Sequence, residues 1–195
     1  MCFVFEGMIS RDFIICARAW KERGELRDDT VVATVMSNLG LHKALESVGV
    51  KVEVTPVGDR NVFLVMQQLG CPIGGEQSGH ILFTDNDLVG CGLYTAMRLL
   101  ALESGREHGL ASQFAAFHRF PQRLVNVAVS KKPDLSKVPA IAAKAAEIEA
   151  LLGNNGRLLL RYSGTEPKCR VMIEAEDEAL TIRLCDDLAA LVKAE

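Results

Sequence analysis

The residues best equipped for chemistry form one run, Arg161-Tyr162-Ser163-Gly164-Thr165-Glu166-Pro167, between two short apolar runs typical of strands. The guanidinium at its start offers a planar fork that matches two phosphate oxygens, and the hydroxyls of Ser163 and Thr165 add donors. Gly164 is expected to permit backbone angles that turn N–H groups towards an anion. Arg170, nine residues after the first arginine, supplies a second guanidinium on the following strand. The run therefore predicts a phosphate-binding loop, and a tight turn carrying a surface arginine is the alternative.

A second polar run, Gly74-Gly75-Glu76-Gln77-Ser78-Gly79-His80, precedes the apolar strand Ile81–Phe83. The carboxylate of Glu76 can accept hydrogen bonds from sugar hydroxyls, each contributing roughly 1.5–3 kcal/mol where water is excluded. Ser78 can donate or accept, and His80 can act as a general acid or base near neutral pH. The alternative is a hairpin connection with solvated side chains. Because the run lacks a Gly-Lys-Ser ending, it does not predict a nucleotide-binding P-loop.

The other candidate groups favour structural or surface roles. Gly90-x-Gly92 lacks the third glycine of a dinucleotide-binding fingerprint. We expect His42, His108 and His118 on the surface, and no Ser–His–Asp set can be assembled from the sequence. The two polar runs together predict a sugar phosphate held in a cleft between two domains.

Length and composition narrow the class of protein. The 195 residues suffice for one large domain or two small ones, and 49% hydrophobic with 24% charged residues is typical of a globular chain. A net charge of −3 does not favour nucleic acid or a membrane surface as partner. No two of the six cysteines are closer than 14 positions, so we expect reduced thiols in a cytoplasmic protein. The sequence contains no recognisable signal peptide or apolar run of roughly 20 residues.

The N-terminal half alternates between strand-like and helix-like runs. Strands are expected at Thr30–Met36, Val50–Val54 and Ile81–Phe83, and helices at Ile9–Arg23, Ser37–Ser47, Asn61–Leu69 and Leu88–Glu103. Such alternation with short links predicts an α/β domain over residues 1–104, with a mixed, mainly parallel sheet and flanking helices. The polar segment Ser104–Gly109 is the predicted linker.

The C-terminal half, residues 110–195, shows a different pattern. Strands are expected at Leu124–Val129, Arg157–Leu160 and Cys169–Glu174, and helices at Ala111–Phe117, Val138–Leu152 and Glu176–Val192. The order predicts a small α+β domain with an antiparallel sheet and helices on one face.

The two polar runs resemble the sugar-binding and phosphate-binding loops of the α-D-phosphohexomutases. The resemblance covers residues 12–193, in order, and includes further matching segments: Thr34-Val35-Met36-Ser37-Asn38-Leu39-Gly40, Val57-Gly58-Asp59-Arg60, Leu124-Val125-Asn126-Val127 and Arg170-Val171-Met172-Ile173-Glu174. In that family the enzyme has four domains, and this chain resembles the third and fourth. The branch that interconverts glucosamine 6-phosphate and glucosamine 1-phosphate through a bisphosphate, in amino-sugar synthesis for the cell wall, is the most similar.

The resemblance implies roles for individual residues. Glu76 and Ser78 would hold the ring hydroxyls of the sugar. The residues implied to hold the phosphate that is not transferred are Arg161, Ser163, Gly164, Thr165 and Arg170. His80, Asp59 and Arg60 would face the reacting centre as catalytic residues.

Three departures from the family pattern limit what the resemblance implies. The chain has no Ser-His-Asn-type phosphoserine loop and no Asp-Gly-Asp-x-Asp-Arg magnesium loop, and Tyr162 stands where the family has lysine. The chain is thus expected to be a fragment that is inactive alone, with no metal ligands of its own and the missing N-terminal domains, or a second copy, as partners. The alternatives are the phosphomannomutase/phosphoglucomutase branch and a non-catalytic phosphosugar-binding module.

Overall fold

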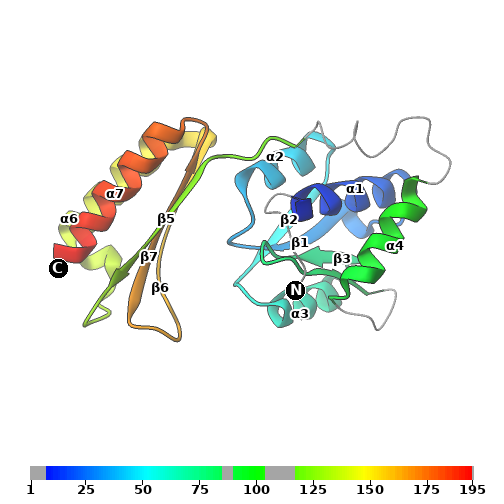
Figure 1. The fold of residues 1–195 in the computed structure, drawn as a ribbon, viewed down its shortest axis with the longest axis horizontal. Helices are drawn as coiled ribbons and strands as arrows, with labels where there is room; N and C mark the ends of the chain where they lie inside the picture. The colour runs from blue at the N-terminus through cyan, green and yellow to red at the C-terminus, as the bar shows by residue number, and fades with distance from the viewer. Residues whose placement is uncertain (1–7, 85–89, 104–116, 195) are drawn as a thin grey trace. The chain divides into compact units, whose positions relative to one another are not determined.

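The computed structural model describes residues 8–84, 90–103 and 117–194. The chain divides into two compact units, Met1–Arg119 and Phe120–Glu195, and each is described by itself (Figure 1). The predicted linker Ser104–Gly109, most of the predicted helix Ala111–Phe117 and the predicted domain limits at residues 104 and 110 fall outside the described residues.

Unit 1 is a four-stranded mixed sheet with helices on both faces. Its elements are α1 (Met8–Glu22), β1 (Thr30–Thr34), α2 (Leu39–Ser47), β2 (Lys51–Thr55), α3 (Asp59–Leu69), β3 (Ile73–Gly75), β4 (Ile81–Phe83) and α4 (Gly92–Glu103). The strand order is β2-β1-β3-β4; β1 is parallel to β2 and β3, whereas β4 is antiparallel to β3. This arrangement confirms the predicted α/β class.

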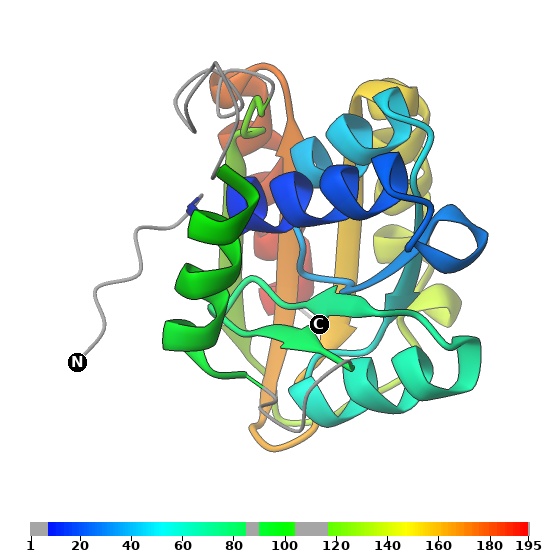
Figure 2. The same ribbon diagram turned by 90° about the vertical axis from the view of Figure 1, so that its right-hand side faces the viewer.

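Alternation along β1 explains the two layers of helices. Val31 and Ala33 join the core beneath α1, α2 and α4, whereas Val32 between them joins a smaller core with Val62 and Met66 of α3. Successive side chains of a strand point to opposite faces, so a continuous apolar run must be covered on both. Figure 2 shows α1 and α2 on one side of the sheet and α3 on the other.

Gly74, the first residue of the polar run that precedes Ile81–Phe83, is part of strand β3 and not of the connection that follows it. It pairs with Val32 of β1 and Leu82 of β4 in the sheet. A Cβ at Gly74 would lie 2.5 Å from Met66 Sδ and 2.6 Å from a methyl carbon of Val62. The glycine lets α3 pack close to the sheet, which places the N-terminus of α3 beside the end of β3.

We expect Gly74→Ala to lower the free energy of unfolding of unit 1 by roughly 1–3 kcal/mol, because the added methyl overpacks the α3 interface. Urea unfolding followed by the fluorescence of Trp20, which is buried in unit 1, measures this change. Gly92→Ala is the matched control, because nothing lies within 4 Å of its added Cβ. Equal stabilities of the two variants would contradict the proposed packing role.

Unit 2 is a three-stranded antiparallel sheet covered by two helices. Its main elements are β5 (Gln122–Ala128), α6 (Pro139–Leu152), β6 (Gly156–Tyr162), β7 (Lys168–Ala175) and α7 (Glu178–Ala194). The order is β5-β7-β6, with both neighbours antiparallel to β7, and α6 and α7 lie on one face of the sheet (Figure 1). The predicted α+β class is confirmed.

Strand β7 shows how the two faces of this sheet differ. Cys169, Val171 and Ile173 join the core beneath α6 and α7. Arg170, Met172 and Glu174 alternate with them and point to the opposite face, where neither helix of unit 2 packs. The residues that carry chemistry in unit 2 therefore lie on the sheet face away from its helices.

The five described cysteines form no disulfide. Cys16, Cys71, Cys169 and Cys185 are buried, and Cys91 is partly exposed. Burial raises the pKa of Cys16 to about 12 and that of Cys185 to about 11. These thiols are therefore protonated and unreactive near neutral pH. None of the described helices combines the length and apolarity needed to cross a bilayer.

Candidate functional site

The polar residues of unit 1 gather where the parallel strands end. Strand β1 leads into the start of α2, β2 leads into the start of α3, and β3 leads into Glu76. Because the carboxyl ends of parallel strands meet at one edge, these three connections lie together. Ligands of open α/β sheets bind at this edge.

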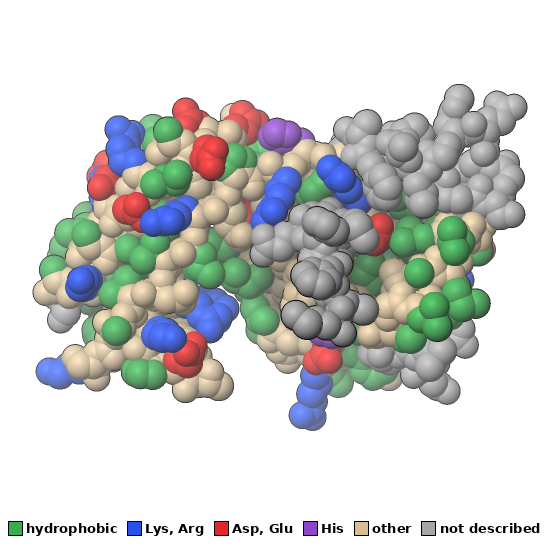
Figure 3. Space-filling view, viewed as in Figure 1, with side chains coloured by type: hydrophobic (Ala, Val, Ile, Leu, Met, Phe, Trp, Pro, Cys, Tyr) green, Lys and Arg blue, Asp and Glu red, His purple; other side chains and the backbone are tan. Residues whose placement is uncertain are grey.

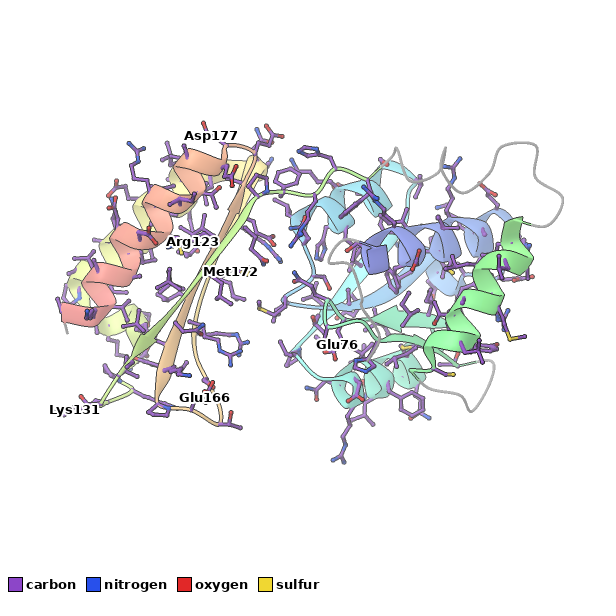
Figure 4. All side chains as sticks on the ribbon, in the orientation of Figure 1. Glu76, Arg123, Lys131, Glu166, Met172 and Asp177 are labelled. Carbon is purple, nitrogen blue, oxygen red and sulfur yellow. The ribbon has the colours of Figure 1, made fainter. Side chains whose placement is uncertain are left out.

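The carboxylate of Glu76 is held from two sides. Ser78 Oγ donates to Glu76 Oε1 at 2.6 Å, and the backbone N–H of Gly58, which caps α3, donates to Oε2 at 3.2 Å. The side chain is only 12% exposed and lies at the N-terminus of α3, the positive end of that helix. Figure 4 shows Glu76 at the end of β3, above α3. A fixed carboxylate of this kind can accept hydrogen bonds from ligand hydroxyls.

The structure brings the predicted residues of unit 1 together. His80 Nδ1 lies 3.2 Å from Ser78 Oγ and 3.4 Å from Glu76 Oε1, on a side chain that is 51% exposed. Asp59 and Arg60 are exposed in the first turn of α3, where Asp59 Oδ1 accepts from the Arg60 backbone N–H at 2.7 Å. The hollow beside Glu76 has a volume of about 10 Å³, room for one water. Asp59, Arg60 and His80 do not line it and form an exposed rim at the same edge of the sheet.

In unit 2, the two predicted arginines lie side by side on the sheet. Strand β6 extends to Tyr162, so Arg161 belongs to the strand and the loop proper is 163–167. The predicted end of this strand at Leu160 is wrong, because Arg161 pairs directly with Arg170 and Tyr162 with Cys169. Both guanidinium groups therefore project from rigid strands on the same face.

This arginine pair is only partly compensated among the described residues: Arg170 is ion-paired with Glu166 at 3.3 Å, whereas Arg161 has no ion-pair partner there. Like charges directly opposite on an antiparallel pair are destabilising. The Nε atoms of Arg161 and Arg170 are buried and make no hydrogen bond in the described structure. Burial, and then the charge of Arg170, lowers the pKa of Arg161. A bound anion would satisfy both groups, so the geometry fits a phosphate or another oxyanion.

The loop 163–167 is closed by its own hydrogen bonds. Ser163 is 3% exposed, and its Oγ accepts from the Glu166 backbone N–H at 3.2 Å. Gly164 does not have a positive φ, and a Cβ there would meet nothing within 4 Å. The expectation that Gly164 supplies an unusual backbone angle is therefore wrong for this conformation. Thr165 is exposed at the tip of the loop.

Three charged residues of this site were assigned no role from the sequence. Lys132 Nζ donates to the Ser163 carbonyl at 2.6 Å, from a loop 31 residues earlier in the chain. Glu166 accepts from Lys168 Nζ at 2.6 Å and from Arg170 at 3.3 Å, and its pKa is lowered mainly by the Lys168 hydrogen bond. Figure 4 shows Lys131 and Glu166 at the same end of the unit 2 sheet. The Lys-Lys-Pro motif at 131–133 was the signal available in the sequence.

Lys132→Ala is expected to weaken the binding of inorganic phosphate by about two- to tenfold. The variant loses one cation and one hydrogen bond that orders the loop, together about 0.5–1.5 kcal/mol. Phosphate titrations followed by ³¹P NMR give the dissociation constants. Lys131→Ala, which removes an exposed neighbour of the same charge, is the control and is expected to change affinity less. The reverse order would show that Lys132 does not act on this loop.

The described residues contain no cluster of three or more histidine, cysteine, aspartate or glutamate side chains that could hold a metal ion. The donor set for a divalent cation is therefore not assembled in the described part of either unit.

Two family models match the chain. Residues 11–120 match "Phosphoglucomutase/phosphomannomutase, alpha/beta/alpha domain III", and residues 124–191 match the C-terminal domain of the same family. The chain is 50% identical over 182 residues to the phosphoglucosamine mutase of Saccharopolyspora erythraea and 49% identical over 180 residues to that of Frankia alni. Each match covers 92% of this chain but only 40% of the relative, so the chain spans about two fifths of their length.

Solved structures support the same fold. An N-acetylglucosamine-phosphate mutase in its substrate complex superposes with a TM-score of 0.74 at 19% identity, over 94% of this chain and 43% of that one. The N-acetylphosphoglucosamine mutase of Aspergillus fumigatus, in complex with GlcNAc-6P and magnesium, gives 0.73 at 18% identity, over 97% and 43% of the two chains. At these identities the likeness shows the fold alone.

Proposed function

Because the chain belongs to the phosphoglucomutase/phosphomannomutase family, we propose that it is the substrate-binding C-terminal part of a phosphoglucosamine mutase. Such an enzyme interconverts glucosamine 6-phosphate and glucosamine 1-phosphate. The relatives of that name that are 41–50% identical to the chain support this choice within the family. The observation that carries the proposal is the pair of opposed arginines, Arg161 and Arg170, whose buried Nε atoms make no hydrogen bond within the described part of the chain.

In this proposal, unit 2 binds the phosphate group that is not transferred. Arg161 and Arg170 supply the guanidinium donors, and the loop adds the backbone N–H of Gly164 and the exposed hydroxyl of Thr165. Ser163 acts mainly by shaping the loop, since its oxygen already accepts from Glu166. Lys132 holds the loop from behind through the Ser163 carbonyl.

Unit 1 supplies the groups that recognise the sugar. Glu76 and Ser78 hold ring hydroxyls, and the Gly58 N–H keeps the carboxylate oriented. The exposed His80 is the candidate proton donor or acceptor towards the ligand. Asp59 and Arg60 extend the same rim as further candidate catalytic residues. We predict that a single ligand contacts both sets of residues. Single substitutions at Glu76 and Arg161 test each set alone.

Phosphoryl transfer also requires a phosphoryl donor and usually a cation that balances the developing charge. We infer that other parts of a full-length enzyme provide the phosphoserine and Mg²⁺, because the chain spans about two fifths of the length of its relatives. The isolated chain is expected to bind glucosamine 6-phosphate without converting it. A coupled assay for glucosamine 1-phosphate tests this, and turnover by the rigorously purified chain would contradict the assignment.

The phosphomannomutase/phosphoglucomutase branch is the second candidate, because the matching family models carry that name. Isothermal titration with the 6-phosphates of glucosamine, glucose and mannose distinguishes the two. Tightest binding of glucosamine 6-phosphate supports the first proposal, and tightest binding of mannose or glucose 6-phosphate supports the second.

We predict that Glu76→Gln weakens glucosamine 6-phosphate binding about fivefold and leaves inorganic phosphate binding unchanged. A neutral acceptor forms hydrogen bonds roughly half as strong as a carboxylate does, a loss of about 1 kcal/mol. Titration calorimetry with both ligands measures the two constants. The control is Glu53→Gln, an exposed carboxylate on β2 of the same unit. If phosphate affinity fell equally in the Glu76 variant, the residue would not recognise the sugar.

A further inference from the structure

Helix α4 presents an apolar stripe to solvent. Leu93, Met97 and Leu100 are 72%, 60% and 66% exposed, the largest values among the large hydrophobic side chains of the described chain. Their spacing of four and three residues places them on one face of the helix. Figure 3 shows hydrophobic side chains gathered over α4, at the right of the view. We call these three residues the α4 stripe.

The charged side chain in the middle of α4 points towards the core of unit 1 and not towards solvent. Arg98 is the one charged residue between Gly92 and Leu102. Its guanidinium lies 5.7 Å from the ring of Trp20 and 5.9 Å from that of Phe83, and its Nε donates to the Tyr94 hydroxyl at 2.8 Å.

Because Arg98 points inward, the outer face of α4 carries no charged side chain between Gly92 and Leu102. Surface helices of soluble proteins normally place charged residues outward, and contiguous apolar patches mark interaction sites. Helix α1 beside it follows the normal pattern, with Arg18 and Glu22 exposed and ion-paired at 3.1 Å.

We propose that the α4 stripe is the docking surface for the part of a full-length family member that precedes the matched region. The chain corresponds to the third and the C-terminal domains, and it covers 40% of the relatives' length. The larger part of such a protein therefore lies outside this chain and ahead of α1. Helix α1 packs directly against α4, as Figure 2 shows. The first described element of the chain therefore lies beside the helix that carries the stripe.

The size of the stripe favours a covalently linked domain over a second copy. An α-helix of 12 residues is about 18 Å long. The area that three side chains on one face of it can bury is therefore small compared with the ~1,200 Å² that a stable independent interface buries. A domain in the same chain docks at a high effective concentration and needs less area. This inference rests on family membership and not on the proposed sugar phosphate.

Co-expression tests the proposal. The tagged N-terminal part of the Saccharopolyspora erythraea relative, up to its matched region, is produced together with this chain. We expect the wild-type chain to co-purify, and the double variant Leu93→Lys/Met97→Lys to be recovered at least tenfold less. Leu151→Lys, which alters a leucine of α6 that is 58% exposed, is the matched control and is expected to behave like wild type.

Three outcomes would overturn the proposal. They are failure of the wild-type chain to co-purify, equal recovery of the stripe variant, and a dimer of this chain alone that the stripe variant dissociates in sedimentation velocity. The last outcome would assign the stripe to a second copy. Unchanged phosphate affinity and circular dichroism of the stripe variant show that both units remain folded, which separates a docking defect from a folding defect and from failure of the ligand assignment.

Discussion

Arg161→Ala is expected to weaken glucosamine 6-phosphate binding at least thirtyfold. The guanidinium projects from β6 beside Arg170, and its buried Nε has no hydrogen-bond partner among the described residues. Its loss removes about 2 kcal/mol of charge-assisted hydrogen bonding to a phosphate dianion. Isothermal titration at constant ionic strength measures the effect. Arg161→Lys keeps the charge but loses the planar fork, so its affinity is expected to lie between those of wild type and the alanine variant.

The Arg161→Ala variant is expected to lose affinity for the ligand without losing stability. Removing one of two opposed, partly desolvated charges is expected to leave the free energy of unfolding of unit 2 unchanged or slightly higher. Arg123→Ala is the matched control, because Arg123 lies in the same sheet but forms an exposed ion pair with Asp186 at 3.1 Å. Wild-type affinity in the Arg161→Ala variant, or an equal loss in the Arg123→Ala variant, would remove the support for a phosphate site.

The largest expected change in stability follows from Glu174→Ala, which should lower the free energy of unfolding of unit 2 by about 3–5 kcal/mol. The Glu174 carboxylate is 0% exposed and accepts from Arg157 Nε at 2.6 Å and from Gln122 Nε2 at 2.9 Å. Truncating it leaves the Arg157 charge without its buried partner, which is the costly way to break such a pair. Hydrogen exchange of the β7 amides reports the opening of unit 2 specifically.

Two further variants are controls for the stability change of Glu174→Ala. Asp186→Ala breaks the exposed pair with Arg123, in which both side chains are nearly half exposed, and is expected to cost less than 1 kcal/mol. The double variant Arg157→Met/Glu174→Leu replaces the buried pair by apolar side chains of similar size, and is expected to recover most of the loss. A Glu174→Ala variant as stable as Asp186→Ala would show that the pair contributes little.

Local sequence patterns predicted the fold class of both units. The apolar run of β1 predicted a strand, and the structure shows it covered on both faces, because Val31 and Val32 point into two separate cores. The limits of elements were less predictable where pairing depends on a distant partner. Arg161 is polar and was assigned to the loop, but its pairing with Arg170 makes it part of β6. A polar residue next to a glycine turn gives no local sign of such pairing.

The groups of the candidate site were predictable from residue type, whereas their contacts were not. Glu76 was identified by its position in a glycine-rich run, but the Gly58 N–H that orients it comes from 18 residues earlier. Lys132 reaches the phosphate loop across 31 residues, and nothing in its own segment distinguishes it from Lys131. Such contacts depend on which strand ends meet at one edge, and that is set by sheet order.

The sequence by itself determined which chemical groups this protein carries: guanidinium and hydroxyl groups near residue 161, and a carboxylate, a hydroxyl and an imidazole near residue 76. Only the tertiary structure decided which of the charges are already neutralised. Arg157 lies opposite Glu174 and forms a buried ion pair, whereas Arg161, four residues further along the same strand, lies opposite another arginine. The strand register sets this difference, because it determines which side chains meet across the sheet and therefore which cations remain available for an anionic ligand.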